Sequence, residues 1–156
     1  MPLKVYIVYG SSFDQVTALR LQALGAVNGM VVYVPPAYTR EQNFSGLDPN
    51  AEHNLTSADV VLGVVTTYPS DSSLQELNLA KTIGKRTIVL ADDAYVSKLD
   101  AAFPGSVFAI DLRNPVQSEH AIVEFLKQTG LEEENKRMLI ALGTLALGLL
   151  LFAPQD

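Results

Sequence analysis

Short apolar runs alternate with stretches of helical periodicity over residues 1–130. Five runs have the length and the β-branched or aromatic content of buried strands: Lys4–Tyr9, Met30–Val34, Val60–Val65, Thr87–Ala91 and Val107–Ile110. Helices are predicted over Gln15–Val27, Ser72–Ile83 and Ser118–Thr129. The first of these has an apolar face made by Val16, Leu19, Ala23 and Val27. Residues 37–57 are weakly patterned and indicate a long loop with one short helix.

Strands that alternate with helices predict right-handed βαβ units and a parallel sheet covered on both faces. We therefore expect an α/β fold, a flavodoxin-like three-layer sandwich with a five-stranded parallel sheet in the order 2-1-3-4-5. In that order the chain reverses direction between the first and third strands. Ligands bind beside the carboxyl ends of the strands at such a point. Function is therefore expected in the loops Gly10–Asp14 and Thr66–Asp71.

The C-terminal stretch, residues 138–153, would be apolar on every side as a helix. We divide the sequence into a domain over 1–130, a charged linker over 131–137 and an apolar C-terminal helix over 138–153. This helix would span about 24 Å, between a buried helix and a membrane span. Three roles stay open: a tail anchor with Lys136 and Arg137 on the cytoplasmic side, the core of an oligomer, or a helix docked on the domain.

The composition narrows the choice of partners. The formal net charge of −6 argues against nucleic acid, because phosphate binding needs clustered Lys and Arg. The chain has no cysteine and two histidines, His53 and His120, so no metal site is expected. The first residues lack the pattern of a signal peptide. A cytoplasmic domain is expected, either free or held at a membrane by the tail.

Glu76 is the strongest candidate for chemistry. It is predicted in the first turn of the helix after the third strand, where the positive helix end would lower its pKa. An ionised carboxylate can stabilise or attack the oxocarbenium-like centre that forms when a ribose–base bond breaks. The alternative is a capping box, in which Ser73 and Glu76 satisfy the backbone of each other.

Other candidates lie in the two loops. Gly10, Ser11 and Ser12 offer backbone donors, and Tyr9 and Phe13 offer aromatic faces for a base; Tyr68, Ser70 and Asp71 offer partners for ribose hydroxyls. Ordinary packing and turn chemistry are the competing interpretation of these residues. Asp92 and Asp93 follow the fourth strand, where a solvated turn is favoured over a Mg²⁺ site.

Three segments resemble the superfamily that joins TIR domains with nucleoside 2-deoxyribosyltransferases: Lys4–Asp14, Ser57–Val64 and Ser70–Leu90. The resemblance implies that Glu76 acts at the anomeric carbon of a sugar. It implies NAD as a substrate rather than a cofactor, and a homo-oligomer as the active form. The transferases usually have an Asp six residues before this glutamate, where the present chain has Ser70.

The resemblance therefore favours a TIR-like enzyme that cleaves the nicotinamide–ribose bond of NAD, with or without cyclisation. A nucleoside 2-deoxyribosyltransferase is the first alternative. A non-catalytic assembly module with a membrane-acting tail is the second.

Overall fold

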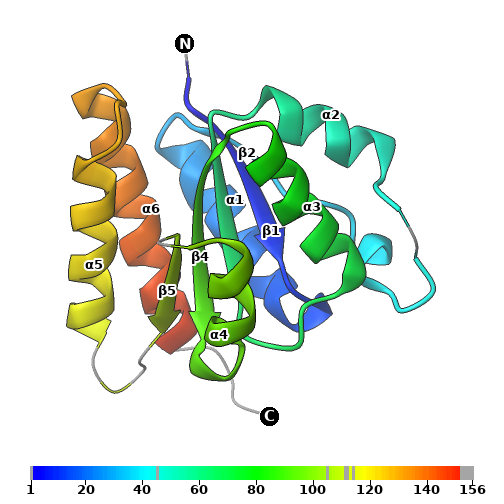
Figure 1. Ribbon diagram of the computed structural model, residues 1–156. Helices are drawn as coiled ribbons and strands as arrows, with labels where there is room; N and C mark the ends of the chain where they lie inside the picture. The colour runs from blue at the N-terminus through cyan, green and yellow to red at the C-terminus, as the bar shows by residue number, and fades with distance from the viewer. Residues whose placement is uncertain (1, 45, 105, 111–112, 114, 152–156) are drawn as a thin grey trace.

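The predicted α/β sandwich is the fold of the chain. The computed structural model describes residues 2–44, 46–104, 106–110, 113 and 115–151. Five parallel strands form one sheet in the order β2-β1-β3-β4-β5 (Figure 1). They are β1 (Lys4–Tyr9), β2 (Val31–Tyr33), β3 (Val60–Val65), β4 (Arg86–Asp92) and β5 (Val107–Ile110). The expected order is confirmed, and with it the reversal between β1 and β3.

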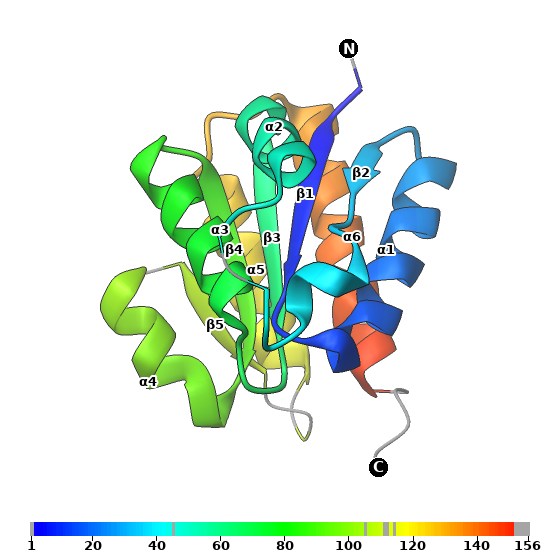
Figure 2. The same cartoon turned by 90° about the vertical axis from the view of Figure 1, so that its right-hand side faces the viewer.

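Helices cover both faces of the sheet (Figures 1 and 2). The described α-helices are α1 (Gln15–Val27), α2 (Pro49–Ser57), α3 (Asp71–Thr82), α4 (Asp93–Ala102), α5 (Pro115–Lys127) and α6 (Glu133–Leu151). Two short 3₁₀ segments, η1 (Ser12–Asp14) and η2 (Ala37–Arg40), lie in the connections that follow β1 and β2.

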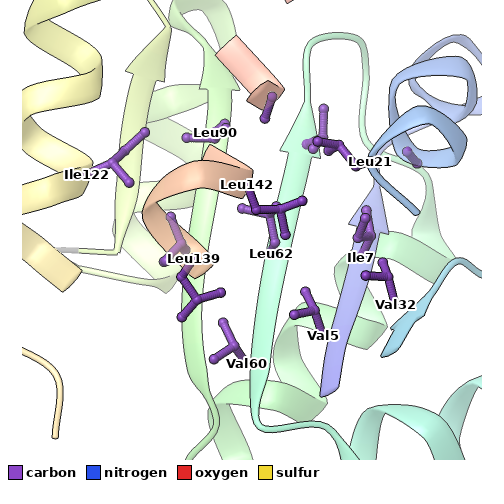
Figure 3. Close-up of a cluster of buried hydrophobic side chains, with 14 of the residues drawn as sticks. Val5, Ile7, Leu21, Val32, Val60, Leu62, Leu90, Ile122, Leu139 and Leu142 are labelled. Carbon is purple, nitrogen blue, oxygen red and sulfur yellow. The ribbon is translucent and has the colours of Figure 1, made fainter. Parts of the chain in front are cut away.

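Helices α1, α5 and α6 share one face of the sheet. Figure 3 shows side chains of β1, β3 and β4 meeting Leu21 of α1, Ile122 of α5, and Leu139 and Leu142 of α6. All of these side chains are buried. The second hydrophobic cluster, on the opposite face, brings together α2, α3 and α4 around Leu55, Leu77 and Leu99. Burial on both faces explains why the central strands are continuous apolar runs.

The C-terminal apolar stretch forms a long helix that is docked on the sheet. Helix α6 begins at Glu133, inside the segment expected to be a linker, and its residues Leu139, Leu142, Ala146 and Leu147 are part of the hydrophobic core. Residues 152 and 153 of the predicted apolar helix lie outside the described residues. In the part of the chain that the structure describes, no helix combines the length and apolar character needed to cross a membrane.

Helix α1 buries a different face from the apolar one that its sequence displays. Its buried residues are Thr17, Ala18, Leu21 and Gly25. Val16, Leu19 and Val27 are exposed. The contact with β2 explains the choice, because a β-carbon on Gly25 would lie 2.5 Å from Cγ2 of Val32. Helix α1 therefore packs the face that contains Gly25 against the sheet and leaves the predicted apolar face exposed.

Candidate functional site

The loops that follow β1 and β3 are joined by hydrogen bonds. The Ser70 amide donates to the Gly10 carbonyl at 2.7 Å, and the Gly10 amide donates to the Val64 carbonyl at 3.1 Å. The hydroxyls of Ser11 and Thr67 are hydrogen-bonded to each other. The two loops singled out from the predicted topology thus form one continuous surface.

The buried side chain of Asp14, in η1 after β1, is hydrogen-bonded to the loop after β3. Its carboxylate accepts hydrogen bonds from the Thr66 amide at 3.0 Å, from the Thr66 hydroxyl and from the Thr67 hydroxyl at 3.3 Å. Burial raises the pKa of Asp14, and these hydrogen bonds act in the opposite direction. Asp14 is therefore a structural tie between the loops rather than a group presented to a ligand.

A pocket of about 960 Å³ opens over this junction. One wall comes from the two loops and from the start of α3: Ser11, Ser12, Phe13, Thr67, Tyr68, Pro69, Ser70 and Asp71. The other wall comes from η2 and the residues after it: Ala37, Arg40, Glu41, Gln42, Asn43 and Phe44. Its volume lies near the upper end of the range for small-molecule sites. The pocket beside the ends of β1 and β3 is therefore large enough for a small molecule.

Behind this pocket, Arg40 and Glu76 form a buried ion pair. Nη1 of Arg40 lies 2.6 Å from Oε2 of Glu76, and Nη2 lies 2.7 Å from Oε1. The Arg40 side chain is 0% exposed and that of Glu76 is 2% exposed. Charge-assisted hydrogen bonds in this bidentate geometry are stronger than hydrogen bonds between neutral groups.

Arg40 is also fixed by β1. Its Nε donates to the Tyr9 carbonyl at 2.8 Å, and its guanidinium lies 4.2 Å from the centroid of the Tyr9 ring. The Tyr9 hydroxyl donates to the Pro35 carbonyl at 2.6 Å. Tyr9 is fully buried, so its role is to hold Arg40 and the chain after β2. The expectation that its ring faces a bound base is not met in this structure.

Two expectations for Glu76 are wrong. Helix α3 begins at Asp71, so Glu76 is in its second turn and not its first. The helix is capped by Ser70, whose hydroxyl accepts from the Ser73 amide at 3.3 Å, and the Ser73 hydroxyl donates to the Ser70 carbonyl at 2.7 Å. Ser73 makes both of these hydrogen bonds with Ser70. The N-cap is therefore Ser70, three residues before the Ser73 of the expected capping box.

The electrostatic environment of Glu76 also differs from the expected one. Burial raises the pKa of Glu76, whereas the hydrogen bonds and the charge of Arg40 lower it. The predicted lowering by the helix end is therefore wrong, because desolvation dominates. Glu76 depends on Arg40 for compensation of its charge.

Tyr6 lies beside this pair. Its hydroxyl is buried and has no hydrogen-bond partner within the described part of the chain. Burial and the Glu76 carboxylate raise the pKa of Tyr6 far above its usual value. The ring stacks on Tyr33, with 5.3 Å between the ring centroids. Two stacked rings, from β1 and β2, thus lie beside the ion pair.

Two serine hydroxyls link the pocket lining to the ion pair. Ser70 lines the pocket, and its Oγ lies 3.2 Å from Oγ of Ser72. Oγ of Ser72 lies in turn 3.5 Å from Nη1 of Arg40 and donates to the Thr39 carbonyl. Glu76 is therefore close to the pocket in the fold but does not line it.

Six of the nine predicted site residues line the pocket: Ser11, Ser12, Phe13, Tyr68, Ser70 and Asp71. Gly10 connects the two loops by its backbone, and a β-carbon there would lie 3.2 Å from Val65 and 3.3 Å from Asp14. Tyr9 and Glu76 lie behind the lining with fully covered side chains. The structure thus gathers the predicted loop residues and sets the predicted catalytic carboxylate apart from them.

Sequence analysis missed the second wall of the pocket. Arg40, Glu41 and Asn43 belong to the segment without clear periodicity, where no motif marks them. The nearest sequence feature is Pro35-Pro36, which ends four residues before Arg40 and restricts the backbone there. The partner of Arg40 is 36 positions away, so the pairing itself carries no local signal.

The Asp92–Asp93 pair starts a helix. Asp92 caps α4 by accepting from the Ala94 amide at 3.0 Å. In the described ranges, no group of three or more acidic, His or Cys side chains is arranged to hold a metal ion.

Comparison of the chain with protein-family models and with curated proteins finds no match.

Proposed function

We propose that this chain binds an N-riboside, a nucleoside or nucleotide, in the pocket over the loops after β1 and β3. The observation that carries the proposal is the position of the pocket. It opens at the point where the β2-β1-β3 order reverses, and both loops contribute hydroxyls and an exposed aromatic ring to it. Ser11, Ser70 and Asp71 suit ribose hydroxyls, and the rings of Phe13 and Tyr68 suit a planar base.

The reaction proposed for the bound ligand is cleavage of its N-glycosidic bond, with NAD as the substrate that the family resemblance suggests. The bond from C1′ of the ribose to the nicotinamide nitrogen breaks, and its electron pair neutralises the pyridinium. Water then adds to C1′ and releases a proton. Glu76 is the candidate carboxylate for stabilising the ribosyl cation. For this role it must exchange its contact with Arg40 for one with the sugar.

A second candidate is a binding module without catalysis, in which Glu76 is purely structural. The bidentate pair with Arg40 favours it, since both oxygens of the carboxylate are already engaged at 2.6 and 2.7 Å. In that case Arg40 and Glu76 serve to fix the wall formed by η2.

One set of assays separates these possibilities. Purified protein is incubated with NAD and, in parallel, with a deoxynucleoside plus a free base; released nicotinamide and exchanged base are measured by chromatography. Binding of the same compounds is measured by calorimetry. Nicotinamide release that is lost in Glu76→Gln while circular dichroism shows this variant folded, and that is kept in Glu52→Gln, an exposed control on α2, supports the glycosidase. Binding without turnover supports the module, base exchange supports the transferase, and absence of binding by every N-riboside overturns the proposal.

A further inference from the structure

The charge carried by the pocket differs from what a phosphate ligand requires. Two side chains place carboxylates on the lining, Glu41 after η2 and Asp71 at the start of α3. Both residues are exposed, and they lie on opposite walls. A phosphate group in the pocket would therefore meet negative charge from two sides.

The positive charge of the lining is already engaged. Arg40 is the cationic residue among the described residues of the lining, and its side chain is 0% exposed. The whole residue is 6% exposed, so its small exposed area belongs to the backbone. The guanidinium donates to Glu76, Tyr9 and Thr39. Arg40 thus balances Glu76 and leaves the two exposed carboxylates unbalanced.

The start of α3 does not replace the missing cation. A helix N-terminus attracts anions through its free amides and its positive end. Here Asp71 places a carboxylate in the first turn, and the Ser70 hydroxyl accepts a hydrogen bond from the Ser73 amide at 3.3 Å. The helix end is therefore already capped and partly neutralised.

The aromatic rings of the lining suit a cation. Phe13 is 71% exposed and Tyr68 is 68% exposed, so a ligand can reach both rings. Tyr68 already accepts a cation from outside the lining, since Nζ of Lys98 lies 5.2 Å from its ring centroid. Aromatic faces and carboxylates together are the chemistry by which proteins recognise organic cations.

We propose that the pocket selects an N-riboside with a cationic base and no phosphate over the phosphorylated forms of the same riboside. This inference rests on the proposed function, because it assumes that N-ribosides occupy the pocket, and within that function it favours a phosphate-free riboside over NAD as the substrate. Glu41 and Asp71 attract the charged ring and repel phosphate, and Phe13 and Tyr68 contact the ring. The net charge of −6 acts in the same direction over the approach to the site.

A matched ligand series tests the inference. The dissociation constants of nicotinamide riboside, nicotinamide mononucleotide and NAD are measured by calorimetry at low and at high salt. We expect the riboside to bind at least about tenfold more tightly than the mononucleotide at low salt, with a smaller ratio at high salt because the charges are screened.

Variants assign the preference to the two carboxylates. The double variant Glu41→Gln/Asp71→Asn should weaken binding of the riboside several-fold, strengthen that of the mononucleotide, and bring their ratio toward one. The control Glu52→Gln/Glu134→Gln removes two exposed carboxylates from α2 and α6, outside the pocket lining, and should keep the ratio. Lys98→Gln tests whether the lysine beside Tyr68 supports phosphate binding; it should leave the mononucleotide constant unchanged.

The outcomes are distinct. Mononucleotide or NAD binding as tight as riboside binding overturns the inference and leaves the proposed function standing. A riboside preference that persists in the Glu41→Gln/Asp71→Asn variant also overturns it. If none of the three compounds binds, the proposed function fails and this inference fails with it.

Discussion

The Arg40 guanidinium binds the Glu76 carboxylate through two hydrogen bonds, at 2.6 and 2.7 Å, in a place where both side chains are almost completely covered. The contact joins the connection after β2 to the middle of α3. It fixes one wall of the pocket and engages both carboxylate oxygens of Glu76.

Removal of one partner of this pair should destabilise the fold strongly. Arg40→Met or Glu76→Gln leaves a buried charge without compensation, and each should lower the free energy of unfolding by about 3–5 kcal/mol. The double variant Arg40→Met/Glu76→Leu should cost clearly less than the sum of the single changes. Urea denaturation measures all three. Additive losses would mean that the two side chains do not depend on each other.

The exposed pair Glu124–Lys127 on α5 is a control, with 3.4 Å between its charged atoms. Glu124→Gln should change stability by less than about 1 kcal/mol, because solvent screens this pair.

Stability should depend on pH through the buried carboxyl groups. The pKa of Glu76 and of Asp14 is raised in the folded state, mainly by burial. The folded chain therefore holds more protons than the unfolded chain between the ordinary carboxyl pKa and the raised one, and the free energy of unfolding falls as the pH rises through that interval. The advantage of the unaltered chain over Glu76→Gln should shrink over the same interval. Denaturation curves at a series of acidic pH values measure it, and an advantage that grows with pH would contradict the raised pKa.

Tyr6 and Tyr9 should respond in opposite ways to loss of their hydroxyls. Tyr6→Phe removes a buried hydroxyl that lacks a hydrogen-bond partner among the described residues, so stability should stay the same or rise by up to about 1 kcal/mol. Tyr9→Phe removes the 2.6 Å hydrogen bond to Pro35 and should cost about 1 kcal/mol. Thermal and urea unfolding check both variants. A clear loss for Tyr6→Phe would place its hydroxyl in a hydrogen bond with Glu76.

Two glycines test how closely the helices approach their neighbours. A β-carbon at Gly25 would lie 2.5 Å from Val32, so Gly25→Ala should cost about 1–3 kcal/mol through overpacking between α1 and β2. At Gly148 in α6 nothing lies within 4 Å of the added carbon, and Gly148→Ala should stabilise by about 0.5–1 kcal/mol through higher helix propensity. Comparable effects at the two positions would contradict the packing described for α1.

Helix α6 should be essential to the domain. Leu142 is 1% exposed, and Leu142→Ala should lower the free energy of unfolding by about 2–5 kcal/mol through cavity formation. Ala141→Ser, at an exposed position of the same helix, should change it by less than about 0.5 kcal/mol. Equal, small effects of the two changes would show that α6 is not packed on the sheet.

The periodicity of the chain was sufficient to predict the sheet. β1, β3 and β5 have the predicted bounds because each is a short apolar run with a clear start and end. Helix α4 was not predicted. Its first residues, Asp92 and Asp93, were interpreted as a solvated turn, and aspartates favour turns and helix caps alike.

The candidate site was predicted in part. Topology alone located the loops after β1 and β3, so the residues of one pocket wall were found. The environment of Glu76 depends on Arg40, which lies in a segment without periodicity and reaches α3 only in the folded chain. A pairing of this kind is a property of tertiary structure, and the local pattern around Glu76 indicated a cap instead.

The position of α6 has a consequence for how the protein is made. Leu139, Leu142 and Leu147 complete the core that α1 covers, so α1 packs against a helix that is synthesised much later than itself. Strands β1 to β4 can pair earlier, but the apolar face that they share with α1 stays uncovered until residue 147 has emerged. The nascent chain therefore exposes this hydrophobic surface until α6 has emerged, and its dependence on chaperones should fall once α6 can pack on the sheet.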